Sequence, residues 1–193
     1  KISISASKDR SNYFCNRNIM ISIDPKNIEV PRLHRYLLGA IGPRPIAFAS
    51  TIDTDGVPNL APFSFFNAFS ANPPILVFSP ARSGRTNTTK DTYNNVKKVP
   101  EVVINVVNYE LVHQMSLTSS PYPSNTDEFI KSGLTPVTSD LIKPFRIKES
   151  PVQFECRVNQ VIELGDKGGA GNLIICEVLK IHISEDVLDE KDM

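Results

Sequence analysis

The sequence predicts a mainly β protein, an antiparallel barrel with short helices inserted between its strands. Strand-like apolar segments recur along most of the chain, and they do not alternate regularly with helices as a doubly wound sheet requires. The last third holds a long hairpin, with alternating residues 152–161 and 172–183 joined by a turn at residues 166–171. Of the 193 residues, 40% are hydrophobic, which suffices for one core, so we expect a single domain over residues 20–193.

The N-terminal part divides into an extension and a first helix. Residues 1–18 are rich in Ser, Asn, Lys and Arg without a sustained period, whereas Met20 starts a stretch typical of a natural beginning. We therefore expect residues 1–19 to be an extension outside the domain core. The hydrophobic spacing of residues 31–38 predicts a helix, which the Gly-Pro-Arg-Pro run at residues 42–45 ends.

The first strands surround a tight turn. Residues 46–52 are strand-like, residues 53–56 have the composition of a hairpin turn, and residues 57–69 form an extended run interrupted by prolines. Two further apolar strands are predicted at residues 75–78 and 102–107.

Three more helices are predicted between the later strands, at residues 90–99, 109–117 and 124–132. Ser124 or Asn125 is the candidate cap of the last helix. Asp127 and Glu128 suit the dipole of its first turn.

The loop over residues 79–92 is the most informative segment. It places hydroxyls, amides, a glycine and three cations between a strand and the start of a helix. Free backbone N–H groups at a helix N-terminus bind phosphate, and Arg82, Arg85 and Lys90 could add charge-assisted hydrogen bonds. An ordinary capped turn with solvated cations explains the same composition, so the loop taken alone favours neither interpretation.

Several ordered motifs give the chain a family resemblance. They are Ala-Ser-Thr-Ile-Asp at 49–53, Asn-Leu-Ala-Pro-Phe-Ser-Phe-Phe-Asn at 59–67, Pro-Pro-Ile-Leu-Val-Phe-Ser at 73–79, Lys-Asp-Thr at 90–92, Asp-Glu-Phe at 127–129, Gly-Leu-Thr at 133–135 and Glu-Ser-Pro-Val-Gln-Phe-Glu-Cys at 149–156. Together they resemble the flavin reductase-like, FMN-binding split-barrel family over residues 21–183, and most closely its flavoredoxin-like branch. The resemblance implies an antiparallel FMN-binding split β-barrel.

The resemblance also implies a set of FMN-binding residues. The ring edge and the ribityl hydroxyls are assigned to Ser50, Thr51, Ser64 and Asn67, and apolar surface near the ring to Phe65 and Phe66. The phosphate is assigned to Ser79, Arg85, Lys90, Asp91 and Thr92. A carboxylate beside a phosphate is repulsive, so we expect Asp91 to cap the helix or brace the loop.

Strand geometry limits this assignment. Because side chains alternate across a strand, Ser64 and Phe66 share one face while Phe65 and Asn67 share the other. Both pairs can therefore reach one ring only where a bulge or bend intervenes, and the nearby Pro62 makes such an irregularity plausible.

The activity implied by the resemblance is that of an FMN-dependent NAD(P)H:flavin oxidoreductase. In such an enzyme NADH or NADPH passes hydride to the flavin, and the protein supplies orientation and excludes water. No catalytic side chain is assigned. A flavoredoxin-like electron-transfer protein and a non-catalytic flavin-binding relative stay open as alternatives, and a monooxygenase or another redox protein is the expected partner.

A homodimer with FMN near the interface is expected as well. The resemblance implies it, and the aromatic residues Phe63, Phe65, Phe66 and Phe69 crowd one extended stretch of which a barrel hides only alternate members. The proline-stiffened loop at residues 119–124 is suited to covering the neighbour's flavin, although a plain surface loop explains it nearly as well.

Composition and charge argue against other classes. The formal net charge is zero, which removes the broad electrostatic attraction to nucleic acid or to an anionic membrane. No apolar run approaches the roughly 20 residues of a membrane-spanning helix, and there is no signal-peptide pattern. We therefore expect a cytoplasmic protein.

Metal and dinucleotide motifs are not apparent in the sequence. Cys15, Cys156 and Cys176 have no zinc or disulfide spacing, and the last two lie in strand patterns that predict a core position. His34, His113 and His182 are scattered, with no carboxylate at ligand spacing, so no metal site is predicted. The glycine-rich residues 165–171 lack the dinucleotide order and are expected to form a hairpin turn.

Overall fold

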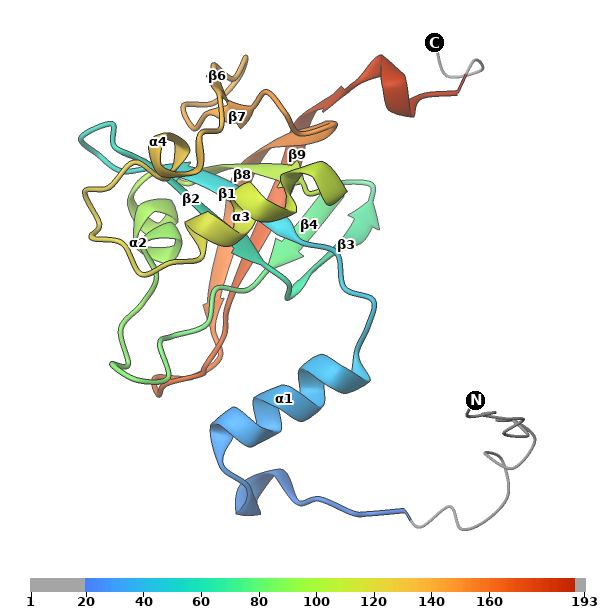
Figure 1. Ribbon diagram of the computed structural model, residues 1–193, viewed down its shortest axis with the longest axis vertical. Coiled ribbons are helices and arrows are strands. Elements are labelled where there is room, and N and C mark those ends of the chain that lie inside the picture. Colours follow the sequence, from blue (N-terminus) through green and yellow to red (C-terminus); the bar gives the residue numbers. More distant parts are fainter. Residues whose placement is uncertain (1–19, 190–193) are drawn as a thin grey trace, which may run out of the picture.

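The structure, a computed structural model, describes residues 20–189 and is built on a seven-stranded antiparallel sheet (Figure 1). The strands follow the order β2-β1-β5-β8-β9-β4-β3, and the two end strands do not pair, so the sheet is not closed. The strands are β1 Ala47–Ile52, β2 Pro58–Phe63, β3 Phe66–Ala71, β4 Pro74–Phe78, β5 Glu101–Val106, β8 Val152–Glu163 and β9 Asn172–Ile183. Strands β6 Pro136–Val137 and β7 Arg146–Ile147 form a separate small pair.

Short helices precede, interrupt and follow the series of strands, and the mostly antiparallel sheet confirms the predicted mainly β fold class. They are α1 Val30–Ala40, α2 Asp91–Lys98, α3 Val112–Thr118 and α4 Glu128–Ser132, with 3₁₀ turns η2 Pro25–Asn27, η3 Tyr109–Leu111 and η4 Glu185–Val187. Helix α2 packs on β1 and β2, whereas α3 and α4 pack on each other and on β2. Helix α1 stands apart from the sheet (Figure 1) and buries none of its residues.

The sequence placed the start of α4 too early. A turn closes over residues 123–126, where the Thr126 N–H donates to the Pro123 carbonyl at 2.9 Å, and the helix begins only at Glu128. The cap is Asp127, whose carboxylate accepts from the N–H groups of Phe129 at 2.8 Å and Ile130 at 3.3 Å. Ser124 and Asn125 therefore lie outside the helix, and Asp127 takes the role predicted for them.

The extended run predicted at residues 57–69 is two strands. Strand β2 ends at Phe63 and β3 starts at Phe66, so Ser64 and Phe65 form a bend between them. A second irregularity shifts the pairing of β3 with β4 between Ala68 and Ser70. The bend that the alternation argument required is present.

Strand β1 is buried on both faces and separates two apolar clusters. Ala47 and Ala49 belong to the cluster that contains Phe78, Ile104, Cys156, Ile174 and Cys176. Phe48 points the other way, into the cluster that contains Leu60, Leu111, Phe129 and Ile147. The alternation of side chains along β1 thus assigns its residues to the two clusters.

Cys156 and Cys176 occupy the core, as predicted. Both are 0% exposed, and burial raises the pKa of Cys156 to about 12 and that of Cys176 well above its usual value. Cys15 and the proposed extension over residues 1–19 lie outside the described residues.

Candidate functional site

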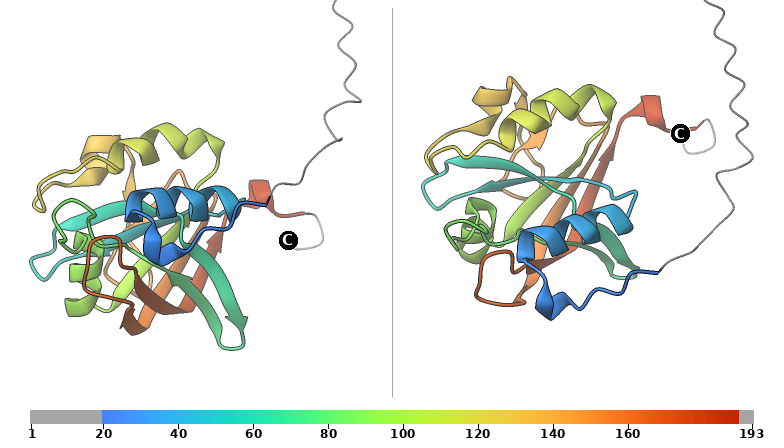
Figure 2. Two further views of the ribbon diagram at one scale, coloured as in Figure 1. Left: turned by 90° about the horizontal axis from the view of Figure 1, so that it is seen from below. Right: turned by 60° about the horizontal axis from the view of Figure 1, so that its bottom comes forward.

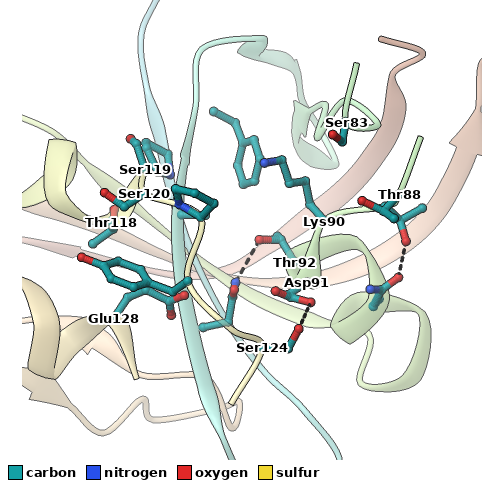
Figure 3. A pocket seen from close by; sticks show the side chains of 18 of the residues that line it. Ser83, Thr88, Lys90, Asp91, Thr92, Thr118, Ser119, Ser120, Ser124 and Glu128 are labelled. Atoms are coloured by element: carbon teal, nitrogen blue, oxygen red, sulfur yellow. Dashed lines mark hydrogen bonds between the residues drawn. The ribbon is translucent and has the colours of Figure 1, made fainter. Parts of the chain in front are cut away.

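The main cavity has a volume of about 810 Å³ and lies over the end of β2. Its walls come from the loop before α2, from the loop after α3, from Glu128 of α4 and from four residues of β2, namely Asn59, Ala61, Pro62 and Phe63. Figure 3 shows Ser83, Thr88 and Lys90 on one side of this cavity and Thr118, Ser119, Ser120 and Glu128 on the other. Segments distant in the sequence therefore meet around one hollow.

One end of the main cavity is cationic. Arg85 and Lys90 line it, and among residues 20–189 neither side chain has a hydrogen-bond or ion-pair partner. Lys90 is the N-cap of α2, and in the part of the chain that the structure describes no side chain caps that helix end, which leaves its first N–H groups available. Hydroxyls from Ser83, Thr86 and Thr88 stand nearby. Unpaired cations beside an open helix N-terminus suit a phosphate.

Arg82, the third cation predicted to bind phosphate, forms hydrogen bonds within the loop itself. Its Nε donates to Asn87 Oδ1 at 3.0 Å, and its Nη2 donates to the Asn87 carbonyl at 2.7 Å. Asn87 adopts a left-handed conformation with φ of 56°, which asparagine tolerates better than most residues. Arg82 therefore fixes the loop shape, and Arg85 and Lys90 are the loop cations that line the main cavity.

The glycine-rich turn between β8 and β9 braces this loop, which agrees with its predicted role as a hairpin turn. The Arg82 N–H donates to the Ala170 carbonyl at 2.8 Å, and the Gly169 N–H donates to the Arg82 carbonyl at 3.0 Å. Asn87 Nδ2 also donates to the Asp166 carbonyl at 2.9 Å. A Cβ on Gly168 would lie 2.9 Å from the Ser83 carbonyl oxygen, so this close approach requires glycine.

Thr92 reaches the main cavity from a buried polar network. Its Oγ1 accepts from Asn59 Nδ2 at 2.9 Å, and both residues line the cavity. Asn59 Nδ2 and Asn95 Nδ2 each donate to Thr51 Oγ1 at 3.2 Å. Thr51 is 0% exposed and lies behind the cavity wall, so it acts on the site through Asn59.

The main cavity also has two acidic lining residues, Asp91 and Glu128. Asp91 accepts from the Ser124 hydroxyl at 3.0 Å and so ties α2 to the loop after α3, as expected of a bracing residue. Glu128 accepts from the Leu60 N–H at 3.1 Å. Burial raises the pKa of Glu128, and the negative charges of Asp91 and Asp127 add to the effect.

Sequence reasoning did not assign Glu128 to the site. From the sequence, Glu128 was expected only to interact with the helix dipole, because its contact with Leu60 joins residues that are 68 positions apart. The Asp-Glu-Phe motif was the available signal, since it placed an acidic pair in a segment of family resemblance.

The remaining predicted residues do not line the main cavity. Ser50 is fully buried, and its hydroxyl has no partner among the described residues. Phe66 pairs with Phe78 across β3 and β4, and Ser79 donates its N–H to the Phe65 carbonyl at 2.9 Å. Ser64 lies in the bend, and the Asn67 side chain accepts from the Ala68 N–H at 2.8 Å. That these predicted residues contact a flavin stays a prediction; they are Ser50, Ser64, Phe66, Asn67 and Ser79.

A second cavity, of about 570 Å³, opens between α1 and the same loop. We name it the α1 cavity. Phe65 lines it, and Phe65 meets His34 of α1 edge to face, with ring centroids 5.9 Å apart. The loop residues Ser83, Arg85 and Lys90 line both cavities.

His182 has carboxylate neighbours that the sequence did not reveal. Its Nε2 lies 2.8 Å from Glu155 Oε1 on the adjacent strand, and Asp140 completes a group whose ligand atoms lie within 4.8 Å of one another. Arg146 and Lys180 also pair with these carboxylates. Because two cations already balance the two carboxylates, we interpret the group as an ion-pair network.

Comparisons with known proteins place this geometry in a family. Residues 40–192 match the profile of the Flavin reductase like domain. An uncharacterized protein of Aquifex aeolicus (strain VF5) is 40% identical over 165 residues, which are 86% of this chain and 82% of the relative.

Solved structures agree in fold. Nitrilotriacetate monooxygenase component B from Bacillus cereus superposes with a TM-score of 0.84 at 32% identity, over 90% of this chain and 86% of the other. A proposed flavin reductase with a split barrel domain from Shewanella frigidimarina NCIMB 400 gives a TM-score of 0.73 at 22% identity, over 87% and 81% of the two chains, and supports the fold alone.

No helix within residues 20–189 combines the length and the apolarity needed to cross a bilayer. The profile match covers well over half of the sequence, and the Bacillus cereus structure agrees with it in fold and in sequence. The chain belongs to the flavin reductase-like family.

Proposed function

We propose that the protein is a flavin oxidoreductase that holds FMN in the main cavity and accepts electrons from NADH or NADPH. One observation carries the proposal: in a chain of this family, Arg85 and Lys90 line the cavity at the N-terminus of α2, and within the described residues neither side chain has a hydrogen-bond or ion-pair partner. A phosphate dianion is the ligand that such a site accommodates best. The cavity volume of about 810 Å³ is within the range typical of cofactor sites.

Different residues lining the main cavity would bind different parts of FMN. Arg85, Lys90 and the α2 N–H groups would bind the phosphate together with Thr92, whose hydroxyl is oriented by Asn59. Pro62 and Phe63 supply apolar wall towards the bend at Ser64, where the ring is expected. Bound FMN would supply the hydride-accepting ring, while these residues orient it and exclude water.

The redox partner is proposed from the family. Since nitrilotriacetate monooxygenase component B is similar to this chain, we propose a monooxygenase or another redox protein as the acceptor of the reduced flavin. We also propose a homodimer in the cytoplasm, and the exposure of the aromatic side chains Phe65 and Phe69 supports the homodimer.

The decisive test is a steady-state assay with NADH and with NADPH, each with and without added free flavin. We expect oxidation of one donor at a rate that rises with added flavin. Retention of a bound flavin that is reduced once, without turnover of free flavin, would instead indicate an electron carrier. Failure to bind any flavin would refute the proposal.

A further inference from the structure

The charged side chains that line the main cavity balance one another. Among the described residues they are Arg85 and Lys90 from the loop before α2, Asp91 from the first turn of α2, and Glu128 from α4. The formal charge of the lining is therefore zero when all four groups are ionised. A ligand that brings a phosphate dianion would leave the filled cavity with excess negative charge, which is unfavourable where water is excluded.

The two carboxyl groups of the cavity differ in how well their charge is compensated. Asp91 is half-buried, accepts from the Ser124 hydroxyl at 3.0 Å and lies at the N-terminus of α2, where the helix dipole favours a negative charge. Glu128 is only 8% exposed and belongs to α4, a helix of five residues. Within residues 20–189 Glu128 has no ion-pair partner. Glu128 is therefore the carboxyl group that is less favoured in its ionised form.

The elements packed around Glu128 add further negative charge. Helices α3 and α4 lie side by side along β2 (Figure 2), and α2 also packs on β2. Strand β2 has no titratable residue, and α3 has one, the exposed His113, which does not line the cavity. Tyr122 lines the cavity from the loop after α3. Burial raises the pKa of Glu128, and the negative charges of Asp91 and Asp127 raise it further.

We propose that Glu128 takes up a proton from the solvent when a phosphate-bearing ligand enters the main cavity, so that ligand affinity falls as the pH rises. The proton binds to the carboxylate, and no bond of the ligand is broken. As a neutral acid, Glu128 can also donate a hydrogen bond into the cavity. The inference rests on the proposed function, because the ligand is taken to be FMN.

Three effects of the bound ligand favour the neutral acid. The ligand displaces water from the cavity that Glu128 lines, and its phosphate adds negative charge. The phosphate also pairs with Arg85 and Lys90, so that these cations no longer offset the charge of Glu128. Figure 3 shows Lys90 and Glu128 on different sides of the main cavity, which leaves room for a ligand between them.

The experiment counts the protons taken up when FMN binds to the full chain. Calorimetric titrations between pH 5 and pH 8, in buffers that differ in ionisation enthalpy, give this number at each pH. The phosphate of FMN itself titrates near a pKa of about 6, so wild type is compared with Glu128→Gln at every pH. Glu128→Gln keeps an oxygen for the Leu60 N–H and cannot titrate. The matched control is Glu110→Gln, at an exposed glutamate that lines neither cavity.

We expect wild type and Glu110→Gln to take up as much as about one proton per FMN more than Glu128→Gln does. Over the same pH range, the affinity of wild type relative to Glu128→Gln should fall by up to about tenfold per pH unit. Asp91→Asn, which keeps an oxygen for Ser124, removes a negative charge near Glu128 and should move the proton uptake to lower pH. Equal proton numbers in wild type and Glu128→Gln at every pH would overturn the inference.

The result is separable from the proposed function. FMN that binds without a proton uptake dependent on Glu128 overturns the inference and leaves the flavin proposal standing. Absence of FMN binding refutes the flavin proposal, and the same titrations with inorganic phosphate then test the inference alone, because phosphate brings the same charge. The inference is overturned as well if inorganic phosphate does not bind, or binds with equal proton numbers in wild type and Glu128→Gln.

Discussion

Lys90 and Arg85 are the residues on which the phosphate proposal depends. Both cations line the two cavities and lack partners in the described part of the chain, so replacing them removes no internal contact. Each charge-assisted hydrogen bond contributes about 1.5–3 kcal/mol, so we expect Lys90→Ala and Arg85→Ala each to weaken FMN binding by about tenfold to a hundredfold. Riboflavin, which lacks the phosphate, should bind the variants as it binds wild type.

Fluorescence titration with FMN and riboflavin measures this difference. Lys98→Ala is the matched control, because Lys98 is an exposed lysine at the other end of α2. Equal losses for both flavins, or unfolding of Lys90→Ala seen by circular dichroism, would mean that the lysine is structural.

Glu128 is held in an environment that opposes its charge. Burial raises its pKa in the folded protein, so ionisation of Glu128 lowers stability as the pH rises from its usual value of 4.5 through the folded value. Glu128→Gln keeps an oxygen for the Leu60 N–H and removes the charge. We expect its stability relative to wild type to increase between pH 5 and pH 7.

Thermal unfolding at the two pH values tests this expectation. Glu128→Ala is the contrasting variant, since it leaves the Leu60 N–H unpaired at a cost of about 1–3 kcal/mol at either pH. A stability of Glu128→Gln relative to wild type that falls as the pH rises would contradict the assigned direction of the pKa shift.

At the scale of elements, the loop before α2 is shaped by the hairpin that joins β8 and β9. Gly168 permits this packing, because a Cβ there would lie 2.9 Å from the Ser83 carbonyl oxygen. Gly168→Ala must displace the loop, and we expect FMN affinity to fall about tenfold while riboflavin affinity changes little. Gly165→Ala is the control, because its Cβ would meet only the Ala170 side chain at 3.3 Å.

The outcome is read from the ratio of the two flavin affinities. A Gly168→Ala protein that keeps the wild-type ratio would show that the loop adapts without moving its cations. A comparable loss in Gly165→Ala would mean that the turn tolerates no side chain anywhere.

The elements that could be predicted from the sequence are those whose own residues show a strand or helix pattern. Strands β8 and β9 alternate, and the apolar residues of α1 have helical spacing, so both could be placed from their own residues. The start of α4 could not, because Ser124, Asn125 and Asp127 are all capable caps and a local turn decides among them.

The candidate site was likewise predictable only where its residues lie close together in the sequence. Arg85, Lys90 and Asp91 lie in one loop and were found together. The pairing of Arg82 with Asn87 depends on a left-handed turn, and the contact of Glu128 with Leu60 joins separate elements. Such contacts arise only when the chain is folded.

At the scale of the whole molecule, the aromatic residues around the end of β2 bear on the predicted homodimer. Phe63 and Phe66 pack against the core, whereas Phe65 is 37% and Phe69 is 68% exposed. We expect light scattering to give about twice the 21.4 kDa chain mass, and Phe69→Asp to shift the equilibrium towards the monomer. The control is Leu141→Asp, at an exposed residue far along the chain.

A single species of 21.4 kDa at micromolar concentration would rule out the dimer and any shared site. An equal shift in Leu141→Asp would show that added charge, and not loss of the aromatic contact, separates the chains.

The two core thiols have a consequence for a protein that handles electrons. Reduced flavins react with dioxygen to give hydrogen peroxide, and a cysteine is oxidised when its thiolate attacks the peroxide. With a pKa raised to about 12, Cys156 is ionised in only about one molecule in 10⁵ at neutral pH. Cys176 is buried beside it with its pKa raised in the same direction. If the proposed chemistry holds, the core therefore resists damage from the oxidant that the protein itself would release.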